Sequence, residues 1–561
     1  MASTAVNGHA PDHDHVLRPR PRKPMHSQVS QLSRLSSADA DGLFPPPQEG
    51  TASGMTSGRS TPVPENAPPS AKSLSSARKQ ARAEQRRRLF PTIEYASRVS
   101  HFDPASDYRD FHGFFNLFWI GLAIMGITTM LRNWKDTGYP LRVQIWSLFT
   151  VKLWHLALAD FLMVASTAVS LPLHRAMRRG GIMAWRKAGI AIQSVYQAVW
   201  LSVWIVIPFW LEWTWTAQVF FLLHTMVLLM KMHSYAFYNG HLSDTERRLH
   251  ELDSPQSASR APAYVYPSPS EAQLPHTKDA KPNGKHEDAG DEDGSDSADE
   301  VEMLRETLAR ELTSPMGNVT YPRNLTWSNY LDYLLCPTLC YELEYPRTAS
   351  INWTSLISKI IATFGCIFLL TVISEEFILP VLVDASARLE NTTSSAADSL
   401  LILTESISWL LFPFALTFLL VFFVIFEYVL GAFAEITCFA DRHFYSDWWN
   451  STDWMEFSRE WNIPVYSFLR RHVYSTTRPL MGRQFATVIT FLISAIGHEI
   501  VMACITKKIR GYGFICQMLQ LPIVILQRTR WVRERRTLNN VCFWCSMILG
   551  LSLICALYVL V

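Results

Sequence analysis

One histidine near the C-terminal end of the sequence lies in an otherwise apolar segment. His498 is flanked by residues 491–501, which are almost entirely apolar. An ionisable imidazole at membrane depth is costly to keep, and this makes it a functional-site hypothesis by default. Ser494 precedes it by four residues and shares its helix face, within reach of the ring. Spacing alone leaves open a second interpretation, a buried histidine that makes a hydrogen bond between helices. Glu499 is turned about 100° away, which favours a contact with another helix.

A second candidate is the stretch 444–450, which reads Phe-Tyr-Ser-Asp-Trp-Trp-Asn. It belongs to residues 440–473, a segment too polar to span a bilayer and rich in aromatic residues. Tryptophan and tyrosine prefer the membrane interface, which explains the aromatic residues individually. An interfacial belt does not explain Asp447 and Asn450 on either side of the tryptophans. An acid and an amide among aromatic rings favour a site where a polar ligand meets an apolar one.

Three acidic residues also lie within apolar runs, namely Asp160, Glu375 and Glu376. They are consistent with a bundle interior polar enough to form a substrate path. They fit structural pairs between helices equally well.

The elements that must position these residues follow from a sharp segmentation of the chain. Residues 1–95 are rich in Pro, Ser and charge, which predicts a disordered cytosolic tail. Residues 241–315 contain an acidic run and predict a disordered cytosolic linker. Two membrane parts remain, 96–240 with four helices and 316–561 with five helices, the candidate loop and the histidine.

The apolar runs predict an all-α polytopic membrane protein, because each is long enough for a bilayer, about 20 residues. We expect about nine transmembrane helices. Their approximate ranges are 113–131, 145–171, 190–211, 216–238, 354–383, 400–432, 484–505, 511–528 and 538–560.

Basic residues predict the orientation of these spans. The cluster at 78–88 and the loops 174–179 and 528–536 fall on one side when nine spans alternate, and the positive-inside rule makes that side cytosolic. The N-terminus is then cytosolic, and so is the stretch 444–450. The basic residues at 507–510 fall on the luminal side, so either the seventh or eighth segment is re-entrant or these side chains snorkel.

A short amphipathic helix is expected near residue 321, ahead of the fifth span. Trp327, Tyr330, Tyr333 and Leu334 recur there at helical spacing. We expect this helix to lie on the membrane surface.

The whole pattern resembles the membrane-bound O-acyltransferase superfamily, and within it the sterol and diacylglycerol O-acyltransferase branch. The family signature Phe-Tyr-x-Asp-Trp-Trp-Asn is met in full at 444–450. Further blocks similar to that branch are 231–235, 337–341, 345–347, 461–465, 471–474 and the His-Glu pair at 498–499. Related chains commonly have histidine where this one has Tyr466, and a catalytic role at that position is therefore not expected.

The resemblance implies a helical bundle with an intramembrane chamber, which acyl-CoA enters from the cytosol and a lipid alcohol from the bilayer. His498 would be the general base on the acceptor hydroxyl. Asn450 would hold the histidine or stabilise the developing oxyanion, and sequence does not separate the two roles. The remaining candidates, expected to bind substrate, are Phe444, Tyr445, Asp447, Trp448, Trp449 and Ser494. No metal, cofactor or covalent acyl-enzyme is expected, since acyl-CoA is a co-substrate.

Within the branch, residues 156–167 and the long N-terminal tail look most like the fungal sterol enzymes. This implies acyl-CoA:sterol O-acyltransferase activity for lipid storage, in the endoplasmic reticulum membrane, with membrane lipids as neighbours and a homo-oligomer, dimer or tetramer, as the assembly. Diacylglycerol acyltransferase is the alternative within the family. A polytopic transporter with His498 and Glu376 as a proton relay is a further alternative, but it leaves the aromatic loop unexplained and the sequence halves show no inverted repeat. The net charge of +2 argues against a nucleic-acid partner.

Overall fold

The computed structural model describes residues 93–103, 106, 112–140, 152–252, 304–391 and 396–560. Within these ranges the regular structure is helical, apart from three isolated β-bridges. The predicted tail up to residue 92, its basic cluster and most of the predicted linker lie outside the described residues. The all-α fold class is confirmed.

Eight helices in the described part of the chain are long and apolar enough to cross a membrane. They are Gly113–Thr137, Leu153–Arg178, Trp185–Trp210, Trp215–Glu251, Trp353–Asn391, Ala396–Ile436, Ile463–Thr506 and Arg536–Leu560. The predicted eighth span corresponds to a shorter helix, α18 (Tyr512–Gln527), of 16 residues. At 1.5 Å per residue it measures about 24 Å, less than the ~30 Å of a hydrocarbon core. The protein is a multi-pass membrane protein, and α18 falls short of a straight crossing.

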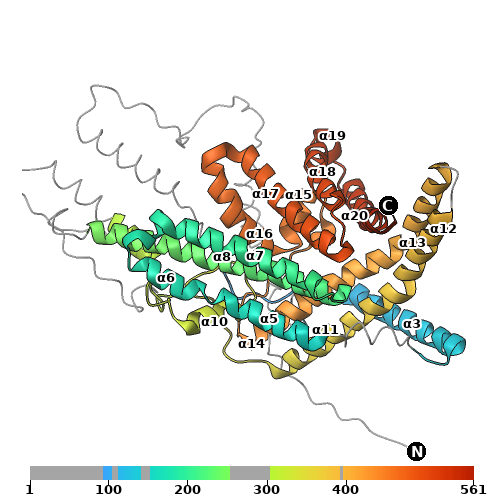
Figure 1. The fold of residues 1–561 in the computed structure, drawn as a ribbon, viewed down its shortest axis with the longest axis horizontal. Helices are drawn as coiled ribbons and strands as arrows, with labels where there is room; N and C mark the ends of the chain where they lie inside the picture. The colour runs from blue at the N-terminus through green and yellow to red at the C-terminus, as the bar shows by residue number, and fades with distance from the viewer. Residues whose placement is uncertain are drawn as a thin grey trace, which may run out of the picture. The chain divides into compact units, whose positions relative to one another are not determined.

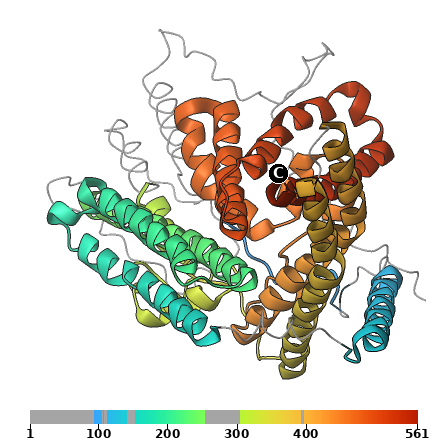
Figure 2. The same ribbon diagram turned by 45° about the vertical axis from the view of Figure 1, so that its right-hand side comes forward.

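The first half of the described chain forms a group of neighbouring helices. Its elements are α3 (His112–Thr137), α5 (Leu153–Thr167), α6 (Ser170–Arg178), η1 (Gly181–Met183), η2 (Trp185–Gly189), α7 (Ile190–Trp210) and α8 (Trp215–Leu252). Helices α7 and α8 lie side by side in both views (Figures 1 and 2). Between α5, α7 and α8 lies an apolar cluster that includes the buried Trp200, Trp204 and Phe221.

The second half carries the candidate residues. Its elements are α10 (Trp327–Leu335), α11 (Trp353–Ile373), η4 (Ser374–Ile378), α12 (Leu379–Asn391), α13 (Ala396–Phe422), η5 (Phe423–Val429), α14 (Leu430–Ile436), η6 (Trp448–Asn450), α15 (Trp454–Glu460), α16 (Ile463–Phe468), η7 (Leu469–Tyr474), α17 (Ser475–Thr506), α18, α19 (Arg530–Arg533) and α20 (Arg536–Leu560). Helix α17 bends at Gly482, whose φ of 82° lies in the left-handed region that glycine adopts readily. The predicted span, which starts at residue 484, begins just after this bend.

Wide π-helical turns interrupt several of the long helices and carry buried charged groups. Glu375 and Glu376 lie in η4, Glu427 lies in η5, and Arg471 and His472 lie in η7, all at most 9% exposed. Such single-turn insertions are frequent at functional sites. In this protein these π-helical turns carry charged side chains that lie in the interior of the bundle.

The helix α8 continues to Leu252, which is 12 residues beyond the boundary predicted at 240. Residues 304–311, also assigned to the linker, are helical. The two segments meet through His241 Nε2 and Glu311 Oε1, 2.9 Å apart, and Leu242 and Leu308 are buried. The ends of the predicted linker are therefore structured, because an apolar stripe within its polar composition packs against neighbouring helices.

The predicted amphipathic helix near residue 321 is present as α10. The Thr326 side chain caps it by accepting a hydrogen bond from the Asn329 backbone N–H at 3.3 Å. Tyr330 and Tyr333 are buried on one face, and Trp327 is 49% exposed on the other. The helix is confirmed as amphipathic, and its place on a membrane surface stays a prediction.

Candidate active site

The stretch 444–450 lies inside the main apolar cluster of the second half. Phe444, Tyr445 and Trp448 are at most 3% exposed. The Trp448 ring stands edge-on to Trp461, with centroids 4.9 Å apart. Further rings around Trp448 belong to Phe418, Phe422, Trp449, Phe457 and Trp544. The side chains of Phe444, Tyr445 and Trp448 are therefore part of the protein core.

The Tyr445 hydroxyl takes part in a buried polar group that the sequence did not predict. It donates to Glu427 Oε2 at 3.0 Å and lies 2.9 Å from Ser100 Oγ. Burial, followed by the charge of Glu427, raises the pKa of Tyr445 well above its ordinary value. The hydroxyl therefore stays protonated at neutral pH and remains a donor to the buried carboxylate.

The backbone of this stretch is tied down from both sides. Trp449 O accepts from Asn540 Nδ2 at 3.0 Å and from Trp544 Nε1 at 3.1 Å, both on α20. Phe444 O accepts the backbone N–H of Ile463 at 3.0 Å. Donors from distant segments thus satisfy carbonyl groups that a loop in an apolar cluster would otherwise leave unpaired.

Asp447 and Asn450 are the more accessible polar members of the stretch. Asn450 Nδ2 makes a long contact of 3.5 Å with Asp447 Oδ2, and the Asn450 side chain is exposed. Ser446 Oγ donates to Asp447 Oδ1 at 3.1 Å. Burial, and then the charges of Asp447 and Glu456, raise the pKa of the nearby Glu460 to about 8. Glu460 is therefore largely protonated at neutral pH, which limits the negative charge beside Asp447.

His498 lies on α17 with an exposed side chain. Its Nδ1 is 2.8 Å from the backbone carbonyl oxygen of Ser494. A carbonyl only accepts, so Nδ1 carries the proton and Nε2 is the basic nitrogen of the neutral ring. Ser494 is on the same helix face, as predicted, but orients the ring through its carbonyl. In the described residues no hydrogen bond joins His498 to Asn450.

In the described chain His498 is not buried, and its hydrogen bond is to its own helix rather than to another helix. Phe491 and Ala495, which precede His498 by seven and three residues on α17, are buried, whereas the His498 side chain is exposed. A catalytic role for His498, and for the stretch 444–450, stays a prediction.

Glu499 contacts other helices, as its rotation from His498 predicted. Its Oε1 accepts the Gly511 N–H at 2.7 Å, and its Oε2 accepts the Phe514 N–H at 3.0 Å and the Tyr558 hydroxyl at 2.7 Å. Tyr558 in turn accepts the Gly513 N–H at 3.1 Å. These bonds satisfy donors at the N-terminus of α18 that lack partners within the helix. They fix α18 and α20 to the helix that carries His498.

Two of the predicted intramembrane acids have clear structural partners. Asp160 Oδ1 lies 2.7 Å from His224 Nδ1, which joins α5 to α8. Glu376 Oε1 accepts from Asn133 Nδ2 at 3.0 Å, which joins η4 to α3. These contacts favour the interpretation as pairs between helices.

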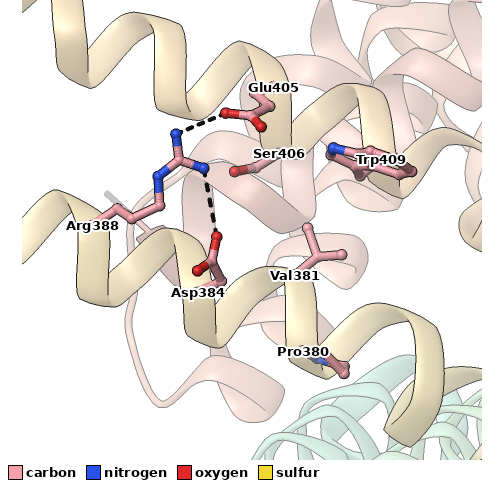
Figure 3. A pocket seen from close by; sticks show the side chains of 7 residues that line it. All are labelled: Pro380, Val381, Asp384, Arg388, Glu405, Ser406 and Trp409. Atoms are coloured by element: carbon pink, nitrogen blue, oxygen red, sulfur yellow. Dashed lines mark hydrogen bonds and ion pairs between the residues drawn. The ribbon is translucent and has the colours of Figure 1, made fainter.

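A small pocket of about 250 Å³ lies between α12 and α13 (Figure 3). Arg388 bridges its two walls, with contacts of 2.8 Å to Glu405 and 3.5 Å to Asp384. The lining is Pro380, Val381, Asp384, Arg388, Glu405, Ser406 and Trp409. None of the predicted site residues lines it. Among the described residues, no group of three or more His, Cys, Asp or Glu side chains is arranged to hold a metal ion.

Ser100, Glu427 and Tyr558 are not among the residues predicted from the sequence. Glu427 was detectable, since it is an acid within the apolar run of the sixth predicted span, like the three acids that were noticed. Ser100 and Tyr558 carry no local signal. A serine in a polar stretch and a tyrosine near a helix end become informative only once their partners are known.

The chain is similar to known proteins over most of its length. The model of the membrane-bound O-acyltransferase (MBOAT) family matches residues 143–560. A Schizosaccharomyces pombe protein named probable sterol O-acyltransferase 2 is 40% identical over 453 residues, 80% of this chain and 87% of its own. Sterol O-acyltransferase 2 of Candida albicans is 32% identical, over 80% of this chain and 75% of its own. Diacylglycerol O-acyltransferase 1 of Dictyostelium discoideum is 33% identical over 245 residues, 44% of this chain and 38% of its own. The chain belongs to the membrane-bound O-acyltransferase family.

Proposed function

We propose that this protein is an acyl-CoA:sterol O-acyltransferase, which transfers a long-chain acyl group to the sterol 3-hydroxyl and releases CoA. The observation that carries the proposal is the 40% identity to a probable sterol O-acyltransferase across 80% of the chain. The complete signature at 444–450 and His498 are further support.

The geometry of His498 supports a role as general base. With its Nδ1 proton donated to the Ser494 carbonyl, the ring presents Nε2 as a proton acceptor. Nε2 takes the proton of the sterol hydroxyl as its oxygen attacks the thioester carbonyl carbon. The C–S bond then breaks, and the imidazolium returns the proton to the departing thiolate. The products are the steryl ester and CoA, with no covalent acyl-enzyme.

The stretch 444–450 is proposed to hold acyl-CoA. Its buried rings support its backbone, and Asp447 and Asn450 are the polar side chains left nearest the surface. Asn450 either orients His498 or stabilises the oxyanion of the tetrahedral intermediate. The Asn450 side chain now contacts Asp447. Either role therefore requires Asn450 to move closer to the reacting atoms when substrate is bound.

The cellular setting follows from the same proposal. Steryl esters are formed for lipid storage, and we place the enzyme in the endoplasmic reticulum membrane, with the N-terminus and stretch 444–450 on the cytosolic side, where acyl-CoA is found. Membrane lipids surround the apolar helices, whose outer faces are largely exposed. The assembly is a homo-oligomer, dimer or tetramer.

Diacylglycerol acyltransferase is the second candidate function. It is favoured by the 33% identity to the Dictyostelium enzyme, but that match covers 44% of the chain. The sterol enzymes match across 80%. Sterol is therefore the expected acceptor.

The test is a microsomal assay with labelled acyl-CoA and either sterol or diacylglycerol. Wild-type protein should form steryl ester, and His498→Ala should reduce the rate by about 100-fold or more, the usual contribution of a general base. His155→Ala is the matched control, because His155 is also an exposed histidine on a membrane-spanning helix. It should retain wild-type activity at equal protein level.

Two outcomes would contradict the proposal. Ester formation that persists in His498→Ala would remove the catalytic assignment. Triacylglycerol as the sole product of the wild type would move the function to the second candidate.

A further inference from the structure

A short segment ahead of α3, residues 93–103, runs beside a later part of the chain and ends in a turn, and we call it the strap. The Arg98 N–H donates to Ala440 O at 3.1 Å, and the Arg442 N–H donates to Arg98 O at 2.9 Å. These two bonds form a parallel bridge between Arg98 and Asp441. Figure 2 shows the strap as a thin blue coil among the orange elements of the later chain.

The Arg98 side chain reinforces this backbone pairing. Its Nε and Nη2 lie 3.0 and 2.6 Å from the two oxygens of Asp441, which makes the ion pair bidentate. The Ala96 N–H adds a third donor to Asp441 at 3.1 Å. The Asp441 side chain is only 6% exposed. Charge-assisted bonds of this geometry are stronger and more directional than a single surface contact.

Ser100 inserts its hydroxyl into the polar group of Tyr445. Ser100 Oγ donates to Glu427 Oε2 at 2.6 Å and lies 2.9 Å from the Tyr445 hydroxyl. Both hydroxyls can thus donate to one buried carboxylate oxygen. A carboxylate in an apolar bundle requires such donors, and the strap supplies one of them from outside the membrane helices.

Two rings of the strap also pack on the stretch 444–450. The His101 ring lies 5.5 Å from Tyr445 and 6.2 Å from Trp449, measured between centroids. The Phe102 ring lies 5.9 Å from Trp449. Together with the contact between Ser100 and Tyr445, these ring contacts tie the strap to the stretch 444–450.

The other end of the strap is anchored in the block that follows α10. The Tyr95 hydroxyl is 2.7 Å from Thr338 Oγ1, and the Ile93 N–H donates to Glu342 Oε1 at 3.3 Å. The strap therefore joins two of the blocks that resemble the acyltransferase family, at 337–341 and 444–450.

We propose that the strap positions the stretch 444–450 for acyl-CoA, with Arg98 and Ser100 as positioning residues that act through Asp441 and Tyr445. This inference rests on the proposed function. A stretch that is ordered before binding imposes no conformational cost on the ligand, whereas one that is ordered in only a fraction of molecules weakens apparent affinity by that fraction. Loss of the strap contacts should therefore raise the KM for acyl-CoA more than the KM for sterol.

The chain offers a matched control for Arg98. Arg178 also forms a bidentate pair, with Glu246 at 3.0 and 3.1 Å, and its side chain is 44% exposed, compared with 45% for Arg98. That pair joins α6 to α8, far along the sequence from the strap. Arg98→Ala and Arg178→Ala each remove a comparable ion pair, but only the first touches the strap.

The experiment measures acyl-transfer kinetics of the full-length chain in microsomes, with the acceptor that the wild type esterifies. Arg98→Ala and Ser100→Ala should each raise the KM for acyl-CoA by about fivefold or more, the effect of losing a hydrogen bond to a charged group. The KM for the acceptor should change less than about twofold, within the usual range for distant sites. Arg178→Ala should leave both values unchanged. An unchanged acyl-CoA KM in both strap variants, or an equal rise in Arg178→Ala, would overturn the proposal.

Amide hydrogen exchange provides a second test of the positioning role, and this measurement does not depend on catalysis. The detergent-solubilised full chain should show faster amide exchange at 439–450 in Arg98→Ala than in wild type or Arg178→Ala. Unchanged exchange there would overturn the positioning role even if wild type is active. Absence of steryl ester in the wild type, with faster exchange in Arg98→Ala, would contradict the proposed function and leave the strap contacts supported.

Discussion

The stretch 444–450 and the segment around His498 differ in how their side chains are held. In the stretch, Phe444, Tyr445 and Trp448 are buried, and partners come from the strap, η5, α15 and α20. His498 is exposed and has one hydrogen bond, to a carbonyl of its own helix. The buried side chains of the signature are thus part of the protein core, whereas Asp447, Asn450 and His498 are more accessible, as their proposed contact with a substrate requires.

The largest stability effect should come from Trp448→Ala. Replacing a fully buried tryptophan by alanine typically costs about 3–5 kcal/mol, and here it also removes the ring around which Trp461 and Trp544 pack. We expect little folded protein by fluorescence-detected size-exclusion chromatography. His498→Ala, measured alongside, should elute like wild type. Equal elution of Trp448→Ala and His498→Ala would contradict the view that the stretch 444–450 supports the fold whereas His498 does not.

A smaller loss is expected when the link between α18 and α20 is weakened. Tyr558→Phe removes the hydroxyl that bonds Glu499 and the Gly513 N–H. Leaving the partly buried Glu499 carboxylate and the buried Gly513 N–H short of a partner should cost about 1–3 kcal/mol, measured as a lower thermal unfolding midpoint in detergent. Tyr512→Phe is the control, since Tyr512 contacts Tyr558 through its ring. An unchanged midpoint in Tyr558→Phe would show that Glu499 holds α18 without it.

Acidification should weaken the region near the strap through His443. Burial, and then the charges of Arg98 and His101, lower the pKa of His443 to about 4. The unfolded chain, with the ordinary value of about 6.5, then binds more protons between pH 6.5 and 4. Stability is full above pH 6.5 and falls as the pH drops through this window.

His443→Gln tests this dependence because glutamine does not titrate. The wild type should lose stability on the order of 1 kcal/mol more than the variant between pH 7 and pH 5, measured by thermal unfolding in detergent. Parallel curves for the two proteins would show that His443 is not responsible.

The smallest stability effect should come from Asn450→Ala. Asn450 is exposed and its side chain has one long contact, so its removal should change stability by less than about 0.5 kcal/mol. Acyl transfer should nevertheless fall, because an oxyanion donor or an orienting amide acts in the transition state. Wild-type turnover in Asn450→Ala would show that Asn450 takes no part in acyl transfer.

Periodicity and composition were sufficient to predict the helices, because forming a helix and spanning the bilayer depend on residues that are close together in the sequence. The apolar runs placed eight long helices close to their observed positions, and aromatic spacing located α10. Helix α8 continues 12 residues past the predicted linker boundary at 240, since the polar surface of α8 conceals the buried Leu242 and Leu249. Composition averages over a helix surface and misses such a stripe.

The sequence alone determined the membrane class, the family resemblance and the residues worth examining, including His498 and the stretch 444–450. Only the tertiary structure decided that the stretch is core, that Glu499 fixes α18, and that Ser100 and Glu427 meet at Tyr445. Ser100 and Tyr445 are 345 positions apart, and no local pattern encodes their contact. A hydrogen bond depends on where two atoms lie in space, and chain folding brings distant residues together without leaving a signal around either one.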